Sequence, residues 1–231
     1  VAYALAILDD DSIAHPRLEF VCTVSEEVGM EGASSIDVSM LKGKKLLNMD
    51  SEEEGIMLAS CAGGCSSRVT LKLDKNKVTG TKLSITLSGL TGGHSGVEID
   101  KGRGNANVLM SRILRDVVAD NNVYLAAFNG GRKDNAIPRE CMAEIIVAAD
   151  KAADVKAAIE NTAKEIKEEF ATSDADLKCV VDISEGCSAE AVTYEDSIRA
   201  VSLIQSLPNG IMRMSQDIDN LVETSLNLGV V

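Results

Sequence analysis

Three acidic residues stand where a catalytic or metal-binding carboxylate is expected. Glu26 and Glu27 come directly after the apolar run 18–24, and Asp50 ends the next apolar run, 45–49. The carboxyl ends of strands in an open α/β sheet meet at the rim where ligands bind. We therefore expect the three carboxylates at one rim, where one can bind a metal while another faces the substrate. The alternative is that the Glu-Glu pair belongs to a solvated loop. Asp50 favours a functional site over a solvated loop. A carboxylate that directly follows an apolar strand is poorly hydrated and needs a partner.

Two further polar residues lie in loops that suit a functional site. His94 is flanked by small residues in the segment TGGHSG, at the end of a predicted strand, and a loop histidine among glycines is a candidate ligand or proton donor. A structural role for this histidine remains equally open. The other histidine, His15, precedes a proline in a polar turn and is interpreted as a surface residue. Asn135 begins a predicted strand in GRKDNAIPRE, where a turn asparagine that stabilises its own backbone is the default interpretation.

These residues do not complete a known type of site by themselves. A catalytic zinc normally takes three protein ligands, often including histidine, and no histidine lies near Glu27 or Asp50 in the sequence. The segment GRGNAN lacks the glycine spacing and the Lys-Ser/Thr pair of a phosphate-binding loop. The acidic run 52–54 is predicted to be a solvated turn.

Composition excludes several classes of function. The 231 residues carry a formal charge of −13, and the lysines and arginines are dispersed, which argues against a nucleic-acid partner. No apolar run reaches the ~20 residues needed to span a bilayer, so no membrane partner is expected. Six cysteines lie mostly in apolar surroundings, and no second Cys or His pair accompanies Cys61 and Cys65. We expect free thiols in a reducing compartment.

The first third of the chain alternates between predicted helix and strand. Residues 2–8 end a helix, and the apolar runs 18–24, 45–49 and 56–60 predict three strands. This order indicates an α/β fold with a partly parallel sheet. A glycine-rich break at 62–64 then separates this part from the rest.

The remaining residues predict a second architecture. Leu83, Ile85 and Leu87 alternate with polar residues, as in a strand with one apolar face. Helices are predicted over 105–118, 155–170 and 194–207, and strands over 123–128, 136–149, 177–183 and 224–230. The order from about residue 80 to 186 is β-α-β-β-α-β, a ferredoxin-like arrangement with four antiparallel strands and two helices on one face.

Five segments together resemble one enzyme family. TVSEEVGMEGA, LLNMDSEEEG, SGLTGGHSGVEIDKGRGNAN, DNAIPRE and PNGIMRMS are similar to the aminoacyl-histidine dipeptidases, which are relatives of carnosinase among the co-catalytic zinc peptidases. The resemblance covers the whole chain. It implies an incomplete zinc-peptidase catalytic sheet in residues 1–63, followed by a lid and dimerisation domain in residues 64–231.

The resemblance also implies a role for each candidate residue. Glu26 would be the general base, Glu27 a ligand of one metal and Asp50 a ligand of the other. His94 would reach the partner subunit's active site to hold the scissile carbonyl oxygen, and Asn135 would contact the substrate from the same lid. The implied cofactor is a pair of zinc ions, with other divalent metals possible.

The function implied is zinc-dependent hydrolysis of Xaa-His-type dipeptides by a cytoplasmic homodimer that pairs through the lid. In the family, further metal and substrate ligands lie outside the stretch matched here, so we expect this chain alone to be inactive and to bind metal poorly. Two alternatives remain. One is a related zinc peptidase or N-acyl amino acid deacylase, and the other is a lid-type binding or dimerisation module without activity.

Overall fold

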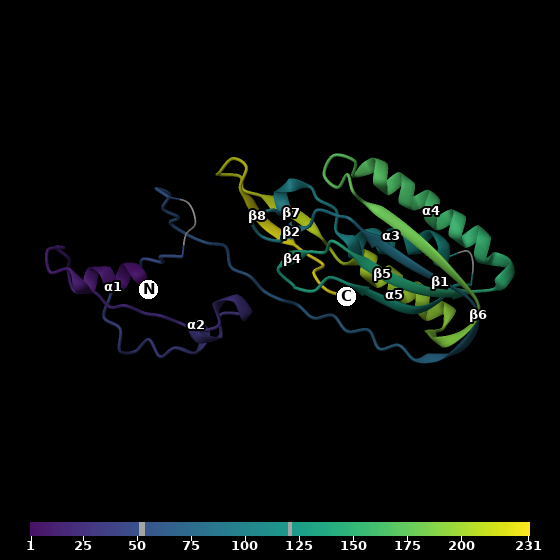
Figure 1. Cartoon of the computed structure of the whole chain (residues 1–231), viewed down its shortest axis with the longest axis horizontal. Helices are drawn as coiled ribbons and strands as arrows, with labels where there is room; N and C mark the ends of the chain where they lie inside the picture. Colours follow the sequence, from purple (N-terminus) through teal and green to yellow (C-terminus); the bar gives the residue numbers. More distant parts are fainter. Residues whose placement is uncertain (51–53, 120–121) are drawn as a thin grey trace. The chain divides into compact units, whose positions relative to one another are not determined.

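The chain divides into two compact units. The computed structural model describes residues 1–50, 54–119 and 122–231. One unit spans Val1–Cys61 and the other Ala62–Val231 (Figure 1). Most of the predicted acidic turn, Glu52 and Glu53, lies outside the described residues. Within the described ranges, no helix is both long and apolar enough to cross a bilayer.

The first unit contains short helices and no strands in its described part. Its elements are α1 (Ala2–Asp9), the 3-10 helix η1 (Glu26–Val28) and α2 (Glu31–Ser35). The helix predicted over 2–8 is confirmed.

The strands predicted over 18–24, 45–49 and 56–60 are wrong for this structure, because no strand forms among the described residues of this unit. Apolar runs favour strands only where neighbouring strands pair with their backbone. No described residue of the unit is buried, and Leu46 is 90% exposed. The unit therefore has strand-forming sequence without the sheet that would order it.

The second unit is built on a four-stranded antiparallel sheet. Its strands are β1 (Lys75–Ser88), β3 (Tyr124–Gly130), β5 (Cys141–Val147) and β6 (Lys178–Val192), in the order β3-β5-β1-β6. Helix α3 (Ala106–Val118) connects β1 to β3, and α4 (Ala152–Glu169) connects β5 to β6 (Figure 1). The predicted β-α-β-β-α-β arrangement is confirmed.

Strand register fixes which side chains enter the core. Ile85 faces Ala143 of β5 and Val181 of β6 across the ladders. The apolar set of β1 is fully buried, and it packs with the stripes of α3 and α4 in one cluster that includes Leu109, Ile113, Val117, Val155, Ile159 and Ile166. Burial of these side chains supplies most of the stability. Burial also raises the pKa of the Cys141 thiol to about 12, so this cysteine is a core residue.

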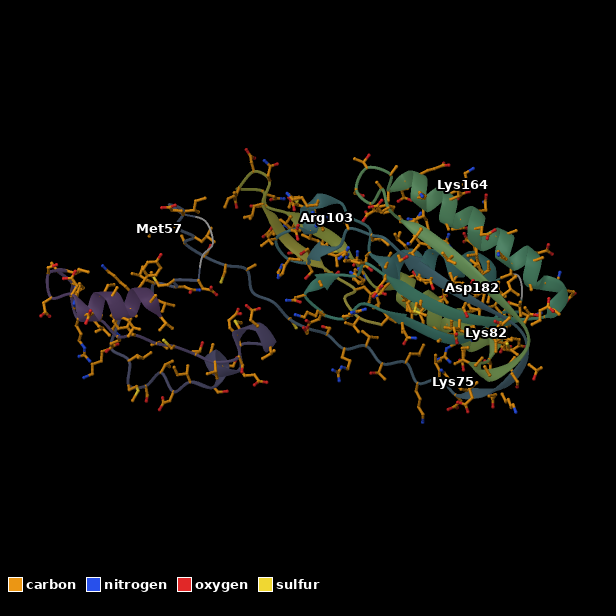
Figure 2. The ribbon with its side chains drawn as sticks, in the orientation of Figure 1. Met57, Lys75, Lys82, Arg103, Lys164 and Asp182 are labelled. Carbon is orange, nitrogen blue, oxygen red and sulfur yellow. The ribbon has the colours of Figure 1, made fainter. Side chains whose placement is uncertain are left out.

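The positions of β1 that alternate with these buried residues are polar. Lys82 of β1 lies 2.9 Å from the carboxylate of Glu144 on β5. Lys82 and Asp182 are both drawn on the strands in Figure 2, and Lys164 lies on α4. A partly exposed pair of this kind adds little stability. A smaller buried cluster of Ala126, Ile146 and Ala191 lies among the polar residues of this face, so the sheet has one large apolar face and one mixed face.

The long strand predicted over 136–149 is interrupted. It divides into β4 (Ala136–Ile137) and β5, and β4 pairs with the short strand β2 (Gly93–His94). Pro138 causes the break, because it has no N–H to donate to a ladder, and its carbonyl accepts from the Ala106 amide at 3.1 Å.

The chain ends in a helix and a hairpin. Helix α5 (Tyr194–Ser206) is confirmed, and the Thr193 side chain caps it through the Asp196 amide. The predicted last strand is shorter, β8 (Val222–Leu226), and it pairs with β7 (Gly210–Met214), which the sequence did not predict. Strand β6 is longer than predicted because β1 pairs with it over nearly its whole length.

The two units predict a contrast in amide hydrogen exchange in this chain. Amides 83–87 lie in a central strand over a buried core, so their exchange requires disruption of the sheet. Amides 18–24 lie in exposed chain without a ladder and should exchange orders of magnitude faster. Exchange measured by mass spectrometry or NMR checks this. Equal protection of both segments would show that the first unit forms a sheet.

Candidate functional site

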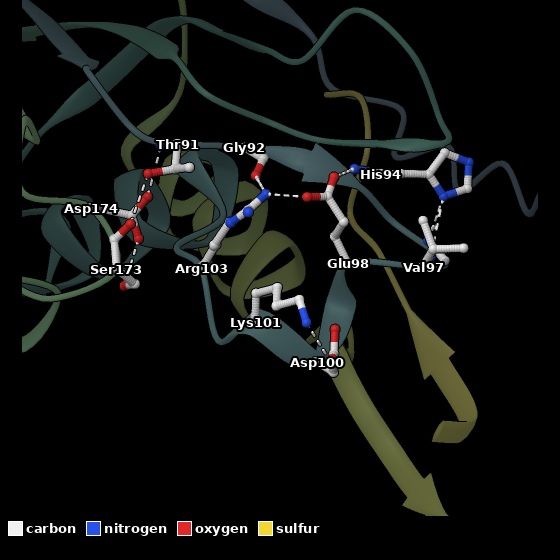
Figure 3. Close-up of polar contacts among 11 residues, drawn as sticks. Thr91, Gly92, His94, Val97, Glu98, Asp100, Lys101, Arg103, Ser173 and Asp174 are labelled. Atoms are coloured by element: carbon white, nitrogen blue, oxygen red, sulfur yellow. Dashed lines mark hydrogen bonds and ion pairs between the residues drawn. The ribbon is translucent and has the colours of Figure 1, made fainter. Parts of the chain in front are cut away.

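A buried carboxylate ties together the two ends of the loop that carries His94. This loop runs from Thr91, after β1, to Gly104, before α3. Asp174 is fully buried, and its carboxylate accepts from the amides of Thr91 and Gly104, both at 2.8 Å, and from the Ser173 hydroxyl at 2.8 Å (Figure 3). Bonds from N–H groups to a carboxylate are stronger than neutral ones. Asp174 therefore fixes where the loop begins and ends.

An ion pair inside the loop holds the backbone next to His94. The Arg103 guanidinium donates to the Gly92 carbonyl at 2.5 Å and to the Glu98 carboxylate at 2.9 Å. The second oxygen of Glu98 accepts from the His94 amide at 2.8 Å. Figure 3 shows this chain of contacts running from Gly92 to His94. Gly93 has a φ of 142°, and a Cβ there would overlap the Arg103 guanidinium, so the ion pair requires a glycine.

The orientation of the His94 ring defines its tautomer. Its Nδ1 accepts from the amides of Gly96 at 3.0 Å and Val97 at 3.3 Å. Because backbone amides only donate, Nδ1 carries no proton, and the proton of the neutral ring is on Nε2. The residue is exposed. His94 can thus present an N–H donor to a carbonyl oxygen.

The structure brings Asn135 beside this histidine. Strands β2 and β4 place His94 opposite Ala136, and the Ser95 amide donates to the Asn135 carbonyl at 2.9 Å. Asn135 is exposed as well. The sequence marked both residues as candidates, but it contained no signal that their backbones pair.

The three carboxylates of the first unit are not gathered into a site. Glu26 and Glu27 begin η1, Asp50 lies in irregular chain, and all three are exposed. Among residues 1–50, 54–119 and 122–231, no group of three His, Cys, Asp or Glu side chains could hold a metal ion. The expected meeting at a sheet rim does not occur here, because the sheet that would supply the rim is not formed.

Sequence reasoning missed the residues that support the loop. Glu98 and Arg103 lie inside the segment GVEIDKGRGNAN, and their charges next to several glycines were the available signal. Asp174 lies in an ordinary polar turn and gave no signal. Its role depends on β1, α3 and β6 meeting at one point.

Comparisons with known proteins agree with this architecture. A family model described as a peptidase dimerisation domain matches residues 85–174, a range that includes His94, Asn135 and Asp174. The whole chain is 42% identical to the cytosol non-specific dipeptidase of Escherichia coli (strain K12), of which it covers 48%. The crystal structure of aminoacylhistidine dipeptidase from Vibrio alginolyticus matches with a TM-score of 0.72 and 31% identity, over 99% of this chain and 47% of that one. The chain thus spans about half the length of these relatives.

The Glu98 bridge predicts a pH dependence of the loop. The His94 amide and then the Arg103 side chain lower the pKa of Glu98 below its ordinary value of 4.5. A lowered folded-state pKa means that the bridge stabilises the loop above the ordinary pKa and is lost as pH falls through the folded-state value. We expect the His94 amide to lose exchange protection below about pH 4.5.

A Glu98→Gln variant is the control for this effect. It keeps an oxygen for the His94 amide and removes the titrating charge, so its protection should be lower at neutral pH and nearly independent of pH in this range. NMR exchange rates measured from pH 3 to 7, corrected for intrinsic exchange, compare the two proteins. A wild-type profile as flat as that of the variant would refute the bridge.

Proposed function

We infer that this chain, a homologue of the cytosol non-specific and aminoacylhistidine dipeptidases, supplies the lid and part of the catalytic domain of a dipeptidase. The observation that carries this is the agreement of sequence and fold with dipeptidases over essentially the whole chain. The activity we propose is hydrolysis of Xaa-His-type dipeptides by the complete protein, in the cytoplasm. For this chain alone we propose no activity, since it spans about half of its relatives.

His94 and Asn135 are proposed to hold the substrate from the lid. An Nε2–H donor aimed at the scissile carbonyl would stabilise the oxyanion that forms when water attacks, a role worth roughly 10²–10³ in rate. Support comes from the ring itself, since both bonds to Nδ1 keep the proton on Nε2. Asn135 is proposed to contact the substrate beside it.

A homodimer through the lid is part of the same proposal. The matched dimerisation domain contains both His94 and Asn135. A residue carried by a dimerisation domain is well placed to act in the partner subunit's active site, and we propose that His94 does so.

Glu26 is proposed as the general base. It would take a proton from the attacking water and return it to the leaving amine. We also propose that the complete enzyme uses two zinc ions or other divalent metals, with Glu27 and Asp50 among the ligands. The described residues do not by themselves fit such a centre, because no three candidate ligands are grouped among them.

Substrate assays on the complete protein separate the candidate activities. Hydrolysis of carnosine-like Xaa-His dipeptides supports the proposal, and hydrolysis of varied dipeptides would indicate the broader activity in the name of the Escherichia coli relative. Cleavage of N-acyl amino acids alone would indicate a deacylase. Absence of all three activities from a folded dimer would leave a binding or dimerisation module.

The two adjacent glutamates predict different outcomes in the complete protein. Glu26→Gln keeps the shape of the side chain and removes the base, so we expect turnover to be lost while metal content is kept. Glu27→Ala and Asp50→Ala should each lower metal content, because a ligand is removed. Metal analysis and dipeptide turnover, measured on the same samples, check this. Loss of metal from Glu26→Gln would show that the two roles are exchanged.

His94→Ala is expected to lower kcat by roughly 10²–10³ without lowering metal content. If His94 acts across the dimer, mixing His94→Ala chains with Glu26→Gln chains should restore activity, because one site in each mixed dimer is intact. Gly96→Ala is a milder test of the ring position than His94→Ala. The added Cβ would lie 3.1 Å from the His94 ring and displace the ring without removing it. No recovery on mixing, despite demonstrated subunit exchange, would place His94 in its own subunit's site.

A further inference from the structure

The side chain of Asn227 clamps the turn that carries Asn135. Its Nδ2 donates to the carbonyl of Asp134 at 3.0 Å and to the carbonyl of Ala136 at 2.9 Å. These two carbonyls flank Asn135 on either side. One carboxamide, reaching back from the C-terminal end of the chain, therefore fixes the backbone on both sides of the proposed substrate contact.

The start of α3 lies on the other side of this carboxamide. Asn105 is 4% exposed and caps α3, and its Oδ1 accepts from the amides of Asn107 and Val108. Its Nδ2 is left to donate, and three acceptors lie within reach: the Oδ1 of Asn209 at 2.9 Å, the Oδ1 of Asn227 at 3.2 Å and the Leu228 carbonyl at 3.2 Å. The carbonyls of Asp134 and Ala136 only accept, so Asn227 turns its nitrogen to them, and its oxygen then faces the Nδ2 of Asn105.

The clamp extends to His94 through the backbone. Ala136 pairs with His94 across β2 and β4, and the Asn135 carbonyl accepts from the Ser95 amide. The segment after Asn227 packs closely on the same turn, because a Cβ on Gly229 would lie 2.7 Å from the Asp134 backbone. A shift of the turn would displace both residues proposed to hold the substrate.

We propose that Asn227 is a positioning residue that holds the Asp134–Ala136 backbone so that Asn135 and His94 are presented together. The proposal rests on the function proposed above only for its effect on catalysis. The clamp itself is a property of the fold and can be tested without activity.

The chain offers a matched pair of variants for the test. Asn227→Asp replaces the donating nitrogen by an oxygen that faces two carbonyl oxygens, so the clamp is lost. Asn209→Asp makes the same chemical change in the same network, but Asn209 only accepts, from Asn105 and from the Leu228 amide at 2.9 Å, and an aspartate keeps both bonds. Asn227→Ala removes the clamp without adding charge.

The first readout is kinetic and uses the complete protein. We expect Asn227→Asp and Asn227→Ala to lower kcat/KM roughly 10- to 100-fold, mainly through kcat, because a small misplacement of groups that act on the transition state is costly. Asn209→Asp should stay within about 3-fold of the wild type, since its bonds are retained. Equal losses at positions 209 and 227, or no loss at 227, would overturn the proposal.

The second readout is hydrogen exchange of the Ser95 amide in the same proteins. It should speed up at least 10-fold in both Asn227 variants and stay unchanged in Asn209→Asp. If the wild type cleaves no dipeptide, the proposed function fails, and Ser95 exchange alone decides the clamp. Unchanged Ser95 protection in a folded Asn227→Ala protein would refute the clamp, and failure of both Asn227 variants to fold would make Asn227 a folding residue instead.

Discussion

The buried carboxylate of Asp174 is the constraint on which the position of the His94 loop depends. A carboxylate removed from water is stable only if its oxygens are fully hydrogen-bonded, and here the donors are the amides at the two ends of the His94 loop. Its own carbonyl accepts from the Leu177 amide at 2.9 Å, next to the start of β6. One side chain thus joins the end of β1, the approach to α3 and the approach to β6.

Around this point the Ala62–Val231 unit combines a rigid scaffold with an exposed loop. The apolar faces of the sheet, α3 and α4 interlock in one cluster, so the elements that flank the loop have little freedom to move. The loop itself is polar, exposed and shaped by glycines that admit the Arg103–Glu98 pair. This arrangement separates the core, which supplies stability, from an exposed loop that a rigid scaffold positions.

The two units differ in how far their own residues can stabilise them. In the Ala62–Val231 unit every strand of the main sheet has a partner and a helix-covered face. In the Val1–Cys61 unit the apolar runs remain exposed, and Glu26, Glu27 and Asp50 lie on irregular chain or a short 3-10 helix. Carboxylates can be gathered by a sheet rim only when the sheet exists. This is the physical reason that the three carboxylates lie apart in this structure.

The sequence by itself determined the elements whose signal is local. The alternation at Leu83–Leu87 and the apolar stripe of α3 follow from neighbouring residues, and so the β-α-β-β-α-β order was predictable. Family motifs also marked His94 and Asn135. Only the tertiary structure decided that the turn carrying Asn135 lies beside the strand of His94, that Asp174 and Asn227 hold these segments, and that three apolar runs of the first unit form no sheet. Those outcomes depend on partners far away in the chain, because a hydrogen bond or a strand pair forms only where folding brings its second half within reach.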